Sequence, residues 1–74
     1  MMRYFKEYKK DGATAFEITK EKARQTLEGY WKEEALDDIF NNEKPFRLFT
    51  PFSYVWTQTE DGLVPQPGFF GVIE

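Results

Sequence analysis

The stretch KPFRLFTPFSYVWTQ, residues 44–58, holds two strand-like runs, FRLFT and SYVWTQ, separated by a proline. Side chains of a strand alternate between two faces, so the odd and even positions of the second run should lie on opposite faces. In the first run, Phe46 and Leu48 likewise oppose Arg47 and Phe49. The stretch therefore predicts two strands of a small sheet and leaves their register open.

The same stretch crowds aromatic residues into a chain that has few other means of stabilisation. The chain has 74 residues, of which 19% are aromatic, and it has neither cysteine nor histidine. Disulfides and thiolate or imidazole zinc sites are therefore excluded, and the core must stabilise the domain alone. We expect most aromatic side chains to be buried, with Phe46, Leu48, Trp56 and Phe69 in the core.

A sheet covered on one side cannot bury every aromatic side chain. Part of the set Tyr30, Phe49, Phe52 and Tyr54 should be left partly exposed. If these residues cluster, they form the kind of apolar patch that marks a protein interface or the seam of a homodimer.

The N-terminal segment MRYFKEYKKDGATAFEIT predicts a β-hairpin. An Asp-Gly dipeptide, suited to the positive φ angles of a type I′ turn, occupies residues 11–12 between two strand-like runs. A two-residue loop at this dipeptide would place Phe5 opposite Ile18 and Lys6 opposite Glu17.

Two short helices should follow. Thr19 is a suitable N-cap for a helix over residues 20–28, and Gly29 is a suitable residue to end it. Without that break, the apolar residues before and after Gly29 would face opposite sides of one straight helix. A second helix should end near Asn41 and Asn42.

The C-terminal segment adds a turn at EDG and a proline-interrupted run in which residues 69–73 form a last short strand. The whole chain, residues 1–74, is thus expected to be a single α+β domain. It should have a small, mostly antiparallel sheet with two short helices packed on one face, in the order β-β-α-α-β-β-β.

The charge distribution restricts the possible partners. The net charge is −3, which argues against a general nucleic-acid binder. Residues 1–24 carry seven basic and four acidic side chains, whereas residues 25–43 carry one basic and six acidic. No apolar run is long enough for a membrane span and no signal peptide is evident, so a cytoplasmic protein without membrane contact is expected.

The second predicted helix has a dense acidic group, formed by Glu33, Glu34, Asp37 and Asp38. Their spacing places them in two rows beside the apolar stripe, and it matches no EF-hand pattern. A solvated helix face explains the group better than a metal site, and the same face could contact a partner protein.

Catalytic residues are scarce. Ser53 is the only serine and lies in no hydrolase elbow, and the GFFG segment at residues 68–71 matches no phosphate-binding loop. An enzyme that uses carboxylates is the least favoured interpretation, and we expect neither a cofactor nor a metal.

An alternative site lies in the basic, aromatic N-terminal segment. Tyr4, Lys6 and Tyr8 share one strand face, and Lys9 and Lys10 follow at the tip. Such residues could stack on the bases and hold the phosphates of a single-stranded nucleic acid. A solvated hairpin whose lysines prevent edge pairing explains the same pattern.

The favoured prediction is a non-enzymatic accessory or regulatory module that binds another protein, through the acidic helix or an aromatic patch near Phe52 and Tyr54. Small acidic proteins of phages and mobile elements often act in this way, which is an analogy of size and charge alone.

Overall fold

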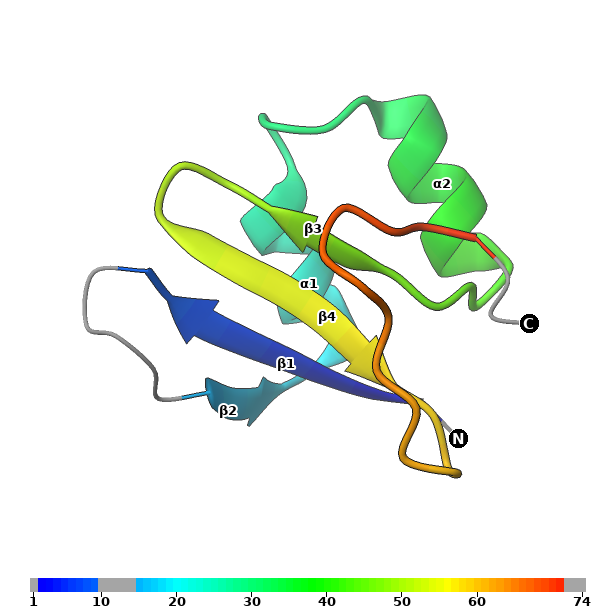
Figure 1. Cartoon of the computed structure of the whole chain (residues 1–74). Coiled ribbons are helices and arrows are strands. Elements are labelled where there is room, and N and C mark those ends of the chain that lie inside the picture. The colour runs from blue at the N-terminus through cyan, green and yellow to red at the C-terminus, as the bar shows by residue number, and fades with distance from the viewer. Residues whose placement is uncertain (1, 10–14, 72–74) are drawn as a thin grey trace.

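Four antiparallel strands form the sheet, in the spatial order β2-β1-β4-β3. The computed structural model describes residues 2–9 and 15–71. In Figure 1, α1 lies behind the sheet and α2 lies toward its β3 edge, and the observed order β-β-α-α-β-β agrees with the α+β prediction. The elements are β1 (Arg3–Tyr8), β2 (Ala15–Ile18), α1 (Lys20–Leu27), α2 (Glu33–Asn41), β3 (Arg47–Phe49) and β4 (Ser53–Gln58).

The helix boundaries follow local signals in the sequence. The Thr19 hydroxyl accepts a hydrogen bond from the backbone N–H of Lys22 at 3.1 Å, as an N-cap does. Gly29, with φ +90°, lies between the two helices, and Asn42 is the C-cap of α2. The predicted break is confirmed, and it lets the apolar stripes of both helices face the sheet.

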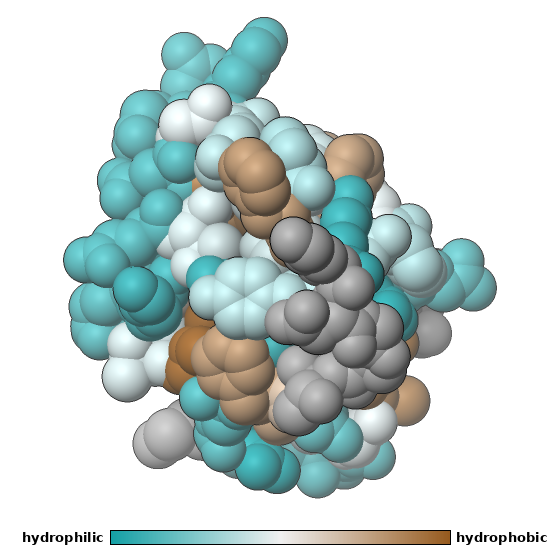
Figure 2. All heavy atoms as spheres, turned by 90° about the vertical axis from the view of Figure 1, so that its left-hand side faces the viewer, coloured by the Kyte–Doolittle hydropathy of each residue, from teal (hydrophilic) through white to brown (hydrophobic). Residues whose placement is uncertain are grey.

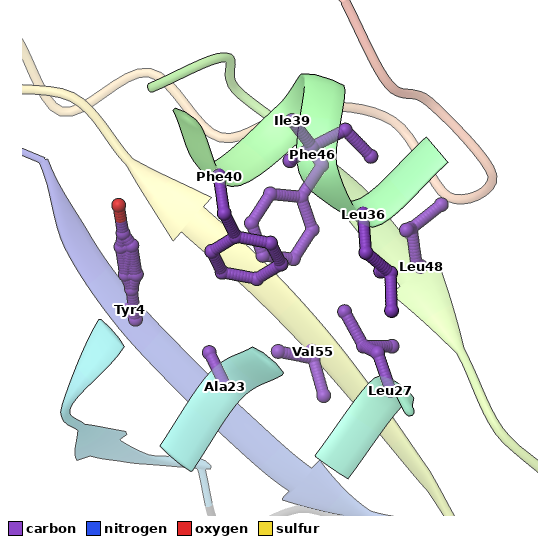
Figure 3. Packing of buried hydrophobic residues seen from close by; sticks show 9 residues of the cluster. All are labelled: Tyr4, Ala23, Leu27, Leu36, Ile39, Phe40, Phe46, Leu48 and Val55. Atoms are coloured by element: carbon purple, nitrogen blue, oxygen red, sulfur yellow. The ribbon is translucent and has the colours of Figure 1, made fainter. Parts of the chain in front are cut away.

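The core lies between the sheet and the helices (Figure 3). The Phe46 ring lies 5.2 Å from that of Phe40 and 6.2 Å from that of Tyr4, and the Tyr4 and Phe40 rings stack at 6.1 Å. The buried apolar residues are Tyr4, Ala23, Leu27, Leu36, Ile39, Phe40, Phe46, Leu48 and Val55.

The predicted alternation in β4 is confirmed. Ser53, Val55 and Thr57 are buried, whereas the residues between them are half-buried on the outer face of the sheet. Phe46 and Leu48 occupy the core as expected. Trp56 and Phe69, which were expected in the core, are only half-buried.

The predicted register of the first hairpin is wrong by one residue. Tyr4, and not Phe5, lies opposite Ile18, and Phe5 lies opposite Glu17. A shift of one residue exchanges the faces, so Tyr4 points into the core and Phe5 stacks on Trp56 outside. The reason is that β1 also pairs along its full length with β4, in an arrangement that packs Tyr4 against the core rings of Phe40 and Phe46. The Asp-Gly dipeptide lies outside the described residues.

The C-terminal segment differs from the predicted last strand. Up to residue 71 it forms an isolated bridge between Phe46 and Phe70 in place of a strand, with backbone hydrogen bonds to Arg47 and Pro45. The Arg47 N–H donates to the Phe69 carbonyl at 2.7 Å, and the Gly68 N–H donates to the Arg47 carbonyl at 2.8 Å. The segment thus covers the outer edge of β3, and residues 72–74 lie outside the described part.

Phe46 should be the most sensitive core position. Phe46→Ala removes a ring that packs against both Tyr4 and Phe40. It should lower the free energy of unfolding by roughly 3–5 kcal/mol. Phe46→Leu keeps most of the buried carbon and should cost clearly less. Urea titration followed by circular dichroism would measure both; an equal loss for the two variants would contradict this account.

Candidate functional site

Large aromatic side chains gather, exposed, at one end of the sheet. Three belong to the predicted interface: Tyr30 (50% exposed), Phe49 (47%) and Phe52 (66%). Tyr8 (43%) and Phe16 (41%) are two further exposed rings. We call these five residues, which come from β1, β2, β3 and two loops, the aromatic end. Figure 2 looks onto this end of the molecule, where brown and pale side chains interrupt the hydrophilic surface.

A tightly bonded turn between β3 and β4 holds Phe52 outward. The buried hydroxyl of Thr50 accepts hydrogen bonds from the N–H groups of Phe52 (3.1 Å) and Ser53 (3.0 Å). The Thr50 N–H also donates to the Ser53 carbonyl at 2.8 Å. Because the polar groups of the turn are satisfied inside, the Phe52 ring is presented to solvent, where the Tyr30 ring meets it edge-on at 6.4 Å.

Trp31 fixes the loop between the helices to the sheet. Its indole N–H donates to the Phe49 carbonyl at 2.8 Å, and its ring lies edge-on to the Phe49 ring at 5.8 Å. A second ring, Phe70, lies 6.4 Å away. Trp31 belongs to none of the predicted sites, although an indole N–H needs an acceptor when it is partly buried.

Two depressions open at the aromatic end. The larger one, of about 470 Å³, lies between α1 and the ends of β1 and β4, and we call it the basic groove. The smaller one, of about 410 Å³, lies over the outer side of the turn and shares Tyr30 and Thr50 with the first. The walls of the basic groove include Lys6, Tyr8, Lys22, Gln25, Tyr30 and Phe52.

The described charges at these depressions are all positive. Lys6 and Lys22 line the basic groove and Lys9 lines the smaller depression, and among residues 2–9 and 15–71 no Asp or Glu belongs to either lining. Within the described part of the chain, none of the three lysines forms an ion pair. The Lys6 ammonium lies 4.6 Å from the Tyr8 ring centre, and that of Lys9 lies 4.8 Å from Tyr54.

The acidic helix is largely engaged within the fold. Arg24 of α1 donates hydrogen bonds to Glu33 at 2.9 Å and to Asp37 at 2.6 Å, which joins the two helices. Asp38 accepts hydrogen bonds from Lys44 at 2.8 Å and from Asn42 at 2.9 Å. Of the four predicted acidic residues, Glu34 alone has no partner among the described residues.

The proposed nucleic-acid residues separate in the structure. Because Tyr4 is only 5% exposed, its ring cannot stack on a base. The same burial raises the pKa of its hydroxyl. This corrects the prediction that Tyr4 belongs to a binding surface. Lys6 and Tyr8 lie at the basic groove, Lys9 lies beside the half-buried Tyr54, and Lys10 lies outside the described residues.

Metal-ligating side chains do not converge in residues 2–9 and 15–71. No three acidic side chains there lie close enough to hold a metal ion. Ser53 is buried, and its hydroxyl lies 3.1 Å from that of Thr50.

Within residues 2–9 and 15–71, neither helix is long and apolar enough to cross a membrane. The chain matches no protein-family model, no curated protein and no solved structure.

The ion pair between Lys44 and Asp38 should be visible in a titration. The hydrogen bond from Lys44 lowers the pKa of Asp38, so Lys44→Gln should raise that pKa toward its ordinary value. Because the folded-state pKa is depressed, the pair stabilises the fold above the unfolded pKa of about 3.9 and ceases to do so as the pH falls through the folded value.

The pKa of Asp38 can be followed by NMR through its side-chain carboxyl carbon. Lys32→Gln is the matched control, because Lys32 has no ion pair with any described residue and its loss should leave Asp38 unchanged. An unchanged Asp38 titration in Lys44→Gln would show that the pair does not form in solution.

Proposed function

We propose that this protein is a non-enzymatic module that binds another protein through its aromatic end. The observation that carries the proposal is the gathering of five large rings, each between 41% and 66% exposed, from separate elements at one end of the sheet. Aromatic side chains are enriched in interface cores, where a few of them supply most of the binding energy.

The local structure supports a preorganised contact surface. The turn that presents Phe52 is closed by hydrogen bonds to Thr50, and the loop that carries Tyr30 is tied to β3 through Trp31. Rings that are already held in place lose little conformational freedom on binding, so more of their burial contributes to affinity.

The acidic helix is the weaker of the two predicted contact surfaces. Glu33, Asp37 and Asp38 already bind cations of the same chain, so a partner would have to compete with Arg24 and Lys44. Tyr54 is half-buried on the outer face of the sheet and contributes less exposed surface than Phe52 does.

The proposal includes a cytoplasmic location, supported by the lack of cysteine in a small domain. A short single-stranded nucleic acid is the alternative occupant of the same end. With Tyr4 buried, its contact residues are reduced to Lys6, Tyr8 and Lys9 within the described part of the chain.

Removal of the two most exposed rings of the aromatic end should strongly reduce partner capture. We expect the tagged wild-type protein to recover one protein in near-stoichiometric amount from a nuclease-treated lysate of its native cells. The double variant Tyr30→Ser/Phe52→Ser should recover roughly tenfold less or worse, because central aromatic residues dominate binding energy. Mass spectrometry would quantify the recovery.

The matched control is Leu63→Ser/Val64→Ser, which removes two exposed apolar side chains from the turn at the opposite end of β4 (Figure 1). It should capture the partner as well as the wild type does. If the aromatic double variant captured as much partner as the wild type does, the proposal would be overturned. If the partner were recovered only from lysate without nuclease treatment, the nucleic-acid alternative would be favoured.

A further inference from the structure

We propose that the basic groove binds an acidic peptide segment of the partner, which places an aromatic or large aliphatic side chain between Tyr8, Tyr30 and Phe52. The inference rests on the proposed protein-binding function and assigns the chemistry of the partner. Its basis is that the described lining of one depression combines exposed rings with lysines and has no carboxylate, and that these lysines form no ion pair with another described residue.

The electrostatic argument comes from the contrast with the rest of the chain. The chain has more acidic than basic residues, 13 against 10, yet lysines are the only charged residues among the described ones that line the groove. Elsewhere, Arg3, Arg24 and Lys44 each bind a carboxylate at 3.0 Å or less. Lys6 and Lys22 have no such partner in the described part of the chain, so carboxylates of a ligand would find them available.

The two lysines stand on different walls. Lys6 comes from β1 and Lys22 from α1, so an extended segment that lies between sheet and helix can meet one ammonium on each side. The groove volume of about 470 Å³ falls within the range of roughly 300–1,000 Å³ typical of ligand pockets. It therefore suits a few side chains of a segment and not a folded domain.

The apolar part of the groove provides the anchor site. Tyr8, Tyr30 and Phe52 present ring surface that is between 43% and 66% exposed. The side chain that enters this space would cover the rings and exclude water from around the lysines. Removal of water strengthens the attraction between each ammonium and a carboxylate, since the local dielectric constant falls.

A long polyanion fits the groove less well than an acidic peptide does. Residues 25–43, which lead from the end of α1 through α2, carry six acidic residues and one basic, and this would repel phosphates that extend beyond the groove. A second copy of the chain is also disfavoured. Its acidic α2 would have to supply the carboxylates for the groove, and three of the four carboxylates of α2 are already engaged internally.

The test uses three short synthetic peptides. The first has a central Phe between Glu and Asp residues, the second has Lys in place of every acidic residue, and the third has Ser in place of Phe. Amide chemical shifts of the full, labelled chain would report binding. We expect the first peptide to bind most tightly, to shift Lys6, Lys22, Ser53 and Phe52, and to weaken as salt is added.

The double variant Lys6→Gln/Lys22→Gln should lower the affinity for the first peptide by roughly five- to tenfold at low salt. Lys20→Gln/Lys32→Gln removes the same two charges outside the groove and should retain nearly the whole affinity. Circular dichroism would verify that both variants are folded, which is expected because none of the four ammonium groups is buried in the core.

The inference would be overturned if the lysine-containing peptide bound as tightly as the first peptide, or if the two double variants lost the same affinity. It would also be overturned if a short oligothymidylate bound the groove more tightly than the first peptide, or if the chain self-associated and Lys6→Gln/Lys22→Gln abolished that association. The proposed function fails separately. If partner capture needs Tyr30 and Phe52 but is unaffected by Lys6→Gln/Lys22→Gln, protein binding through the aromatic end is supported. In that case the inference that the groove binds an acidic segment is wrong.

Discussion

The pairing of β1 with β4 is the contact on which the rest of the structure depends. It joins the first strand to the last strand of the sheet over six residue pairs, from Arg3 with Gln58 to Tyr8 with Ser53. The pairing decides that Tyr4 and Val55 face the helices while Phe5 and Trp56 face outward. It also brings the end of β1 beside the turn before β4, so that Tyr8, Lys6 and Phe52 line one groove.

The small size of the domain explains why its surface is so aromatic at one end. The core that forms between one sheet face and two short helices holds nine of the described apolar residues, and among their rings only Tyr4, Phe40 and Phe46 are fully inside. Most of the other described rings are half-buried on the outer face or exposed at the aromatic end. Several large rings exposed on a domain with a small core leave apolar surface in contact with water. A surface of this kind is typical of an interaction site.

The charges follow a division between structure and surface. Arg24 is shared by two carboxylates of α2, which joins α1 to α2, and Lys44 binds the carboxylate of Asp38 beside the end of α2, so much of the acidic helix is engaged within the fold. Glu33 and Glu34 also lie in the first turn of α2, where the helix dipole favours negative charge. The lysines near the aromatic end lack a comparable structural role among the described residues.

The sequence by itself determined the features that depend on neighbours along the chain. The cap at Thr19, the break at Gly29 and the alternation in β4 arise from local hydrogen bonds, backbone freedom and strand periodicity, and all three were predicted. The exposure of Tyr30, Phe49 and Phe52 was also foreseeable, because a core of this size cannot hold every ring.

Only the tertiary structure decided the features that depend on distant partners. The hairpin register was predicted from its turn alone, but the contact with β4 places Tyr4 inside. Nothing in the spacing of Glu33 and Asp37 indicated that both would bind Arg24. Likewise, Lys6 and Lys22 are far apart in the sequence and on different elements, and a groove forms between them because the packing of α1 on the sheet brings the two walls together.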